Sequence, residues 1–202
     1  NGKMPTTTFL RYITDNGRKI YSFNAENTQI ISSDTAYLIE DCLVDTVKNG
    51  TAKTLSTLPF TLASKTGTVS NNKGENTDGW NVSFCDKFTI AVWHGNANET
   101  GGGYPTRHAY NIWKKLYDEN EKSIFQTGFE RPKSIISLPI DTYSTRKLNS
   151  VVLASSNTPQ KYVKNELFKQ SNKVNFGISL FENCSFNFDI SVKNELKRIE
   201  IS

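Results

Sequence analysis

The sequence predicts an α+β fold with a small β unit at its C-terminal end. Two segments, 33–47 and 106–117, repeat apolar residues at helical spacing. Short apolar stretches bounded by turn residues are typical of strands, and they occur at 9–23, 60–68, 80–84 and 88–93. Beyond about residue 125 the periodicity is mostly two, which favours strands over helices.

Composition places the chain among folded proteins and excludes several function classes. With 202 residues, 36% of them hydrophobic, it can bury the core of one domain and a small appendage. Its net charge of +4 comes from 24 basic and 20 acidic residues spread along the chain, so we expect no nucleic-acid partner. No apolar run approaches the roughly 18 to 20 residues of a membrane-spanning helix, so we expect no membrane contact by this chain itself.

Cysteines and histidines suggest neither a metal site nor a cofactor. Cys42, Cys85 and Cys184 lie far apart without C-x-x-C spacing, and we expect ordinary buried thiols. His94 and His108 are the only histidines, and nothing local in the sequence supports their meeting. We therefore predict no metal ligands and no cofactor.

The N-terminal part is predicted to form a hairpin and then a helix. Asn16-Gly17 separates two β-prone stretches and supplies the positive φ of a tight turn. The helix is expected to be capped by Ser33 or Asp34, to begin at the next residue, and to end before Asn49-Gly50. Its apolar stripe consists of Ala36, Ile39, Leu43 and Val47.

The central part is predicted as strands and a second helix. Apolar residues at successive positions of 88–93 are typical of a central strand covered on both faces. The second helix is expected to be capped by Thr106 and to bury Trp113 and Tyr117. We also expect Trp80 in the core.

Polar composition at 118–133 marks a predicted domain boundary. We divide the chain into a portion 1–125 and a β-rich extension 126–202. Within the extension we expect a strand at 134–142, a short helix at 159–168, and three strands in the tail, the clearest at 185–191.

The segment Lys65-Thr66-Gly67-Thr68 is the strongest candidate for chemistry. A strand presenting an ammonium, two hydroxyls and a glycine can hold an acyl-transfer substrate, because the polar groups bind a carboxylate and the glycine permits close backbone approach. The backbone N–H near Thr68 would then be one oxyanion donor. Taken alone, the tripeptide is equally compatible with a strand end entering a turn.

Further motifs accompany this strand in a fixed order: Ile31–Tyr37, Val47–Ala52, Ala63–Thr68, Asp78-Gly79-Trp80 and Ile90–Asn96. Together they resemble the end of the transpeptidase domain of penicillin-binding proteins, most closely that of the bifunctional class A enzymes. The resemblance covers about residues 5–120, with a fainter echo at 132–168.

This resemblance implies a serine-type D,D-transpeptidase that cross-links peptidoglycan stem peptides, is acylated by β-lactam antibiotics and lies outside the cytoplasm at the cell envelope. It implies the penicillin-recognising, β-lactamase-like α/β/α sandwich around an antiparallel sheet. By motif matching, Lys65 is the catalytic candidate and helps to bind the substrate. Thr66 and Thr68 would bind its carboxylate, and Gly67 would keep the strand edge open.

The family's nucleophile is the serine of an S-x-x-K motif on a helix that precedes the Lys-Thr-Gly strand. Two S-x-x-K matches exist here, Ser70 with Lys73 and Ser144 with Lys147, but both follow that strand and neither lies in a helical pattern. We therefore predict that the chain is the C-terminal portion of a larger enzyme and is inactive alone. Its partner would be the remaining N-terminal part of the transpeptidase domain.

Two departures and two alternatives accompany this interpretation. The family commonly has Gly at the position of Ser64 and a Gly-Tyr step where Ser83-Phe84-Cys85 stands. One alternative is an autonomous, non-catalytic extracellular wall-binding or adhesion module with a degenerate transpeptidase fold. Lys65 and Thr68 argue against it, because a purely structural strand does not need them. The other is an unrelated α+β domain with an accidental Lys-Thr-Gly, which leaves the ordered motifs unexplained.

Overall fold

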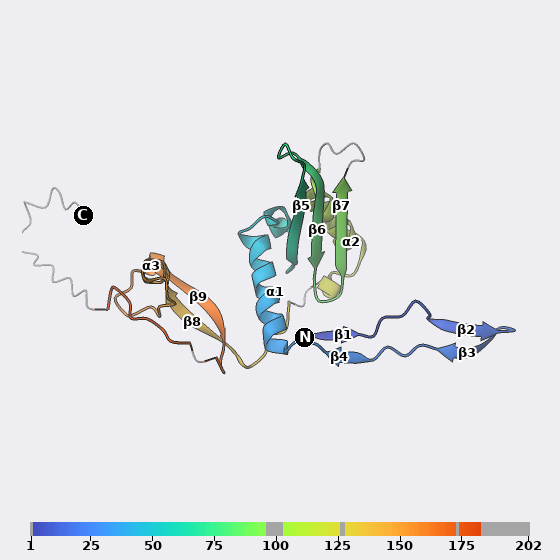
Figure 1. The fold of residues 1–202 in the computed structure, drawn as a ribbon, viewed down its shortest axis with the longest axis horizontal. Helices are drawn as coiled ribbons and strands as arrows, with labels where there is room; N and C mark the ends of the chain where they lie inside the picture. Colours follow the sequence, from blue (N-terminus) through green and yellow to red (C-terminus); the bar gives the residue numbers. More distant parts are fainter. Residues whose placement is uncertain (1, 96–102, 126–127, 173, 183–202) are drawn as a thin grey trace, which may run out of the picture. The chain divides into compact units, whose positions relative to one another are not determined.

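A computed structural model describes residues 2–95, 103–125, 128–172 and 174–182. The chain divides into two compact units, Asn1–Ser134 and Ile135–Ser202. Helices alternate with antiparallel strands, so the α+β class is confirmed (Figure 1). In the described part of the chain, no helix is both long and apolar enough to cross a membrane.

The first unit begins with a two-stranded antiparallel ribbon. Strand β1 (Lys3–Pro5) pairs with β4 (Asn27–Gln29), and β2 (Tyr12–Asp15) pairs with β3 (Arg18–Ser22). Asn16 and Gly17 connect β2 to β3 with φ angles of 45° and 79°, as a tight hairpin turn requires. The predicted hairpin is therefore confirmed, and all residues of these four strands are exposed.

Helix α1 (Ser33–Lys48) starts one residue earlier than predicted. Ser32 is its N-cap, and the Ser32 side chain accepts a hydrogen bond from the Thr35 backbone N–H. The helix ends at Lys48, before Asn49-Gly50 as predicted, and Asn49 is its C-cap. At Gly50 a Cβ atom would lie 2.8 Å from the Thr46 Cα, so the chain can leave the helix this tightly only because residue 50 is glycine.

Three strands form the central sheet in the order β5-β6-β7, all antiparallel. They are β5 (Ala63–Ser70), β6 (Asn76–Phe84) and β7 (Thr89–Gly95). Strand β7 pairs only with β6 among the described strands, and its residues alternate between exposed and half-buried. The prediction of a central strand covered on both faces is therefore wrong here, because among the described residues of the first unit the helices pack on one face of the sheet.

The core lies on the covered face. Helix α2 (Pro105–Glu119) packs there behind β6 and β7, while α1 lies along β5 (Figure 1). The short 3-10 helices η1 (Lys53–Thr57) and η2 (Lys122–Phe125) complete the layer. Its buried residues are Val47, Ala52, Leu55, Leu58, Leu62, Cys85, Ala109, Trp113 and Phe125.

The burial predicted for the aromatic and cysteine side chains is confirmed at some positions and wrong at others. Trp113 is fully buried and Tyr117 packs against the core, as predicted for the apolar face of α2. Trp80 is 44% exposed, because its position on β6 points to the opposite face of the sheet, so its assignment to the core is wrong. Cys85 is buried as expected, whereas Cys42 is exposed on α1. Cys184 lies outside the described residues.

The second unit contains strand β8 (Ile135–Asp141), paired antiparallel with β9 (Val163–Lys169). The strand predicted at 134–142 is confirmed, but the helix predicted at 159–168 is wrong. Only Gln160–Tyr162 form a 3-10 turn, η3, and the rest pairs with β8. Helix α3 (Thr142–Leu148) was not predicted. The strand expected at 185–191 lies outside the described residues.

Candidate functional site

The four predicted site residues occupy the middle of β5, an edge strand among the described strands. Because side chains alternate along a strand, Thr66 and Thr68 project to one face and Lys65 to the other. The structure thus brings the two hydroxyls together and separates them from the ammonium. Lys65 is exposed, and its Nζ donates a hydrogen bond to the Thr66 carbonyl at 2.8 Å.

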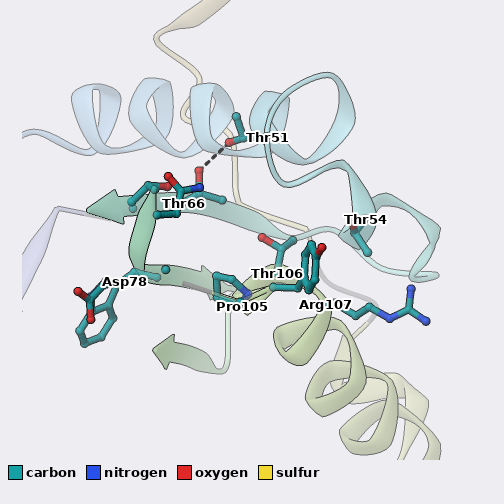
Figure 2. A pocket seen from close by; sticks show the side chains of 14 residues that line it. Thr51, Thr54, Thr66, Asp78, Pro105, Thr106 and Arg107 are labelled. Atoms are coloured by element: carbon teal, nitrogen blue, oxygen red, sulfur yellow. Dashed lines mark hydrogen bonds between the residues drawn. The ribbon is translucent and has the colours of Figure 1, made fainter. Parts of the chain in front are cut away.

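A pocket of about 480 Å³ lies against this strand. Threonine hydroxyls dominate its lining, together with the backbone of Gly67 and the start of α2 (Figure 2). Its residues are Thr51, Thr54, Thr66, Gly67, Thr68, Asn76, Asp78, Gly79, Trp80, Gly103, Tyr104, Pro105, Thr106 and Arg107. Lys65 does not line it.

Strand register brings three of the sequence motifs side by side near this pocket. Gly67 lies opposite Trp80, and Thr68 lies opposite Gly79. Gly79 in turn lies opposite His94 of β7. Segments far apart in the sequence therefore meet beside Thr68, and Gly79 lines the pocket there.

Thr51, from the turn after α1, extends the site. Its Oγ1 lies 2.8 Å from the Thr66 Oγ1 in a hydrogen bond that Figure 2 shows as a dashed line. Sequence analysis placed Thr51 in a motif but gave it no role, and its signal was the Gly-Thr turn ahead of the strand. Thr54 and Arg107 line the pocket without any sequence signal that could have identified them.

Buried polar side chains on the covered face of the sheet form hydrogen bonds next to the pocket. Asn81 on β6 is fully buried, and its Nδ2 donates to the Ser64 Oγ at 3.0 Å and to the Thr106 Oγ1 at 3.4 Å. The Trp113 Nε1 donates to the Ser83 Oγ at 2.7 Å. The bond to Thr106 holds the first turn of α2 against β6, and the bond from Trp113 holds the middle of the helix there. Among the described atoms, the Asn81 Oδ1 finds no hydrogen-bond partner.

The opposite face of the sheet is apolar, and no described residue of the first unit covers it. Val69, Trp80, Val82 and Trp93 are 52%, 44%, 40% and 54% exposed. Lys65 projects among them, because it lies opposite Val82 in the register. A contiguous apolar surface of this kind usually marks a site of interaction with other protein.

The two S-x-x-K matches lie in different structural settings. Ser70 ends β5 and its Oγ donates to the Asn76 Oδ1 at 3.0 Å, with Lys73 in the following turn. Ser144 and Lys147 do lie on a helix, α3, so the expectation of a non-helical setting is wrong for this pair. Ser144 is nevertheless fully buried, and its Oγ donates to the Asp141 Oδ2 at 2.6 Å. A substrate cannot reach it in this fold.

Threonine hydroxyls are the main hydrogen-bond donors of the pocket, and they donate readily to a carboxylate. The start of α2 adds little, because Pro105 has no N–H and the Arg107 and His108 N–H groups already donate to the Tyr104 carbonyl. Arg107 adds a cation at the rim. Among the residues described, no group of three or more His, Cys, Asp or Glu side chains is placed to hold a metal ion.

The fold and site thus define an α+β protein whose hydroxyl-lined pocket lies at a sheet edge. No family model matches the chain. Penicillin-binding protein 1A of Pseudomonas aeruginosa is 32% identical over 145 residues, which is 70% of this chain and 16% of that protein. Penicillin-binding protein 1A/1B of Bacillus subtilis is 25% identical over 181 residues, 83% of this chain and 19% of the relative.

Penicillin-binding protein 1B of Buchnera aphidicola is 35% identical over 106 residues, 51% of this chain and 13% of the relative. The chain is therefore homologous to part of the penicillin-binding proteins, and the resemblance predicted from its motifs is confirmed. It spans between 13% and 22% of the length of the curated relatives it matches.

Proposed function

We propose that this chain contributes the Lys-Thr-Gly strand of a serine-type D,D-transpeptidase at the cell envelope. The enzyme would cross-link peptidoglycan stem peptides and would be acylated by β-lactams. The observation that carries the proposal is the pocket that gathers Thr51, Thr66 and Thr68 at an edge strand. The homology to penicillin-binding proteins supports it.

In this proposal the edge of β5 binds the substrate as an extended strand. Backbone groups on the outer side of an edge strand are open to pairing with a peptide. Thr66 and Thr68 donate to the carboxylate of the stem peptide or of the β-lactam, and Gly67 permits close approach. One backbone N–H near Thr68 stabilises the oxyanion when the serine Oγ attacks the carbonyl carbon.

Lys65 takes part from the other face of the strand. We propose that the apolar surface around it is covered by the segment that carries the serine, which completes the α/β/α sandwich. Lys65 would then lie beside the hydroxyl network of the nucleophile, with its ammonium balancing the charge that develops there. This division explains why one strand presents its ammonium and its hydroxyls on opposite faces.

The alternative of an autonomous wall-binding module fits the structure less well. A module that folds and acts alone is expected to cover its apolar surface, whereas Trp80, Val82 and Trp93 are all exposed. Binding of a hydrophobic dye to the isolated chain measures this directly, because an autonomous module should bind little.

The proposal is tested by acylation with a reactive penicillin, read by intact mass. The isolated chain should gain no adduct, and a longer version of the protein that extends upstream should gain one penicillin per molecule. Lys65→Ala in the longer protein should slow acylation by at least about 100-fold. Lys73→Ala, at an exposed lysine in the turn after β5, is the matched control and should leave the rate unchanged.

Two results contradict the proposal. Acylation of the isolated chain at Ser70 or Ser144 shows that the chain carries its own nucleophile. Equal acylation rates for Lys65→Ala and Lys73→Ala show that Lys65 lies outside the site.

A further inference from the structure

The fold brings the two histidines of the chain into contact. His94 lies near the end of β7, and His108 lies in the first turn of α2. The His108 Nε2 and the His94 Nδ1 are 3.2 Å apart. His94 is half-buried and His108 is exposed, so solvent and ions can reach the pair.

The separation of the two nitrogens matches a shared metal ion. With Zn–N bonds of about 2.1 Å, two ligand nitrogens lie about 2.9 Å apart at a right angle and about 3.4 Å apart at the tetrahedral angle. The observed 3.2 Å falls between these values. Both imidazoles come from regular elements, so little conformational entropy would be lost when they bind together.

The ring orientation agrees with this geometry. A head-on hydrogen bond between two imidazoles adds one ring radius at each end of the nitrogen separation, which places the centroids farther apart than the observed 5.1 Å. The rings are therefore not aligned end to end, and their planes make an angle of 53°.

Gly103 holds the pair in place. It adopts a φ of +58°, and a Cβ atom there would lie 1.8 Å from the His94 Nδ1. Only glycine fits against the ring at this position. The backbone before α2 thus packs on His94 and limits its rotation away from His108.

We propose that His94 and His108 form a two-imidazole site for a divalent transition-metal ion, for which zinc is the probe. Imidazole nitrogen suits zinc, copper and nickel and discriminates against magnesium. Because no third protein ligand is in place among the described residues, water completes the coordination. This inference is independent of the proposed transpeptidase role.

A bound ion would join the end of β7 to the first turn of α2. That turn carries Pro105, Thr106 and Arg107, which line the threonine pocket. The metal would therefore stabilise one wall of the pocket without entering the proposed reaction.

The test uses the complete 202-residue chain without a histidine tag. Because the chain has two histidines, proton NMR resolves one ring resonance from each imidazole. On addition of zinc chloride, both resonances should shift together and saturate at one equivalent. His94→Asn and His108→Asn should each weaken binding at least about 10-fold, as read by calorimetry, and magnesium chloride should have no effect.

Cys42→Ser is the matched control, because the exposed Cys42 thiol is the other accessible soft ligand. Its zinc affinity should equal that of the unchanged chain. Melting curves without zinc show whether each variant folds. The NMR titration of the unchanged chain tests the proposal even if a variant does not fold. The proposal fails if only one resonance shifts, if the two saturate at different zinc concentrations, if neither shifts at millimolar zinc, or if Cys42→Ser abolishes binding.

Discussion

The two faces of the central sheet reverse the usual distribution of polarity. On the face covered by the helices, the strands bury the polar side chains of Ser64, Asn81 and Ser83 completely. On the open face, Trp80 and Trp93 are about half exposed, at 44% and 54%. Neighbouring positions of the same strands thus place polar groups inside and aromatic groups outside. The polarity of the strand residues therefore does not determine which face of the sheet the helices cover.

The covered face is stabilised from the helix side. The buried apolar atoms of its core come chiefly from α1, η1 and α2. The strands contribute hydrogen-bonding side chains, such as Ser83, which accepts a hydrogen bond from Trp113. The open face has apolar atoms, but the described part of the first unit gives it no layer to pack against. Its apolar surface is therefore available to another segment of protein.

The largest expected effect separates two tryptophans, one on each side of the sheet. Trp113→Ala should destabilise the first unit by about 3–5 kcal/mol, because it opens a large cavity and leaves the Ser83 hydroxyl without its donor. Trp93→Ala removes a half-exposed ring and should cost about 1 kcal/mol or less. Urea unfolding followed by circular dichroism measures both, and equal losses would contradict the distinction between the faces.

The second expected effect lies in the other unit, where a buried polar group is fully hydrogen-bonded. Asp141 accepts hydrogen bonds from the Ser144 N–H at 2.9 Å, the Ser144 Oγ at 2.6 Å and the Ser179 Oγ at 2.6 Å. Asp141→Asn should destabilise the second unit by about 2–3 kcal/mol, because an amide cannot accept all of these bonds. Hydrogen exchange of the β8 and β9 amides reports the loss, and Asp118→Asn at an exposed site is the control.

The same carboxylate predicts how stability depends on pH. Burial raises the pKa of Asp141, but the hydrogen bonds from Ser144 and Ser179 outweigh it and hold that pKa below its ordinary value. A carboxyl with a lowered pKa stabilises the fold above its unfolded pKa, and this stability is lost as the pH falls through the folded value. The second unit should therefore loosen below about pH 4, and Asp141→Asn should flatten this dependence. An unchanged acid transition in the variant would count against this role.

The third expected effect is a loss of stability when a buried polar side chain on the covered face of the sheet is removed. Asn81→Ala should cost about 1–2 kcal/mol, because the Ser64 and Thr106 hydroxyls lose their donor. The loss is limited because the Asn81 Oδ1 has no partner to lose in the described structure. Val82→Ala, one position along on the open face, is the matched control and should change the urea midpoint less. The reverse order would show that the open face is packed in solution.

The smallest effect on folding concerns the open face itself. The double variant Trp80→Lys and Trp93→Lys should change the stability of the isolated chain by no more than about 0.5–1 kcal/mol, because both positions are about half exposed. It should lower hydrophobic-dye binding several-fold. In a longer protein that extends upstream, the same change should impair penicillin acylation. Full acylation there would show that this face is not covered by the remainder of the enzyme.

The sequence by itself determined the local elements and the family. Helix α1 followed from its cap and apolar spacing, the β2–β3 turn from Asn16-Gly17, and the kinship with penicillin-binding proteins from motifs around Lys65. These features depend on neighbours a few residues apart, so the sequence displays them directly. The segment 163–169 was misassigned, because its conformation depends on pairing with β8.

Only the tertiary structure decided which residues share a site. Thr51 reaches Thr66, and His94 reaches His108, through contacts that span 15 and 14 residues of sequence. It also decided that Lys65 lies on the face opposite to Thr66, and that Trp80 stays exposed. Strand register and the side chosen by α2 fix these outcomes, and both depend on long-range packing that no local pattern encodes.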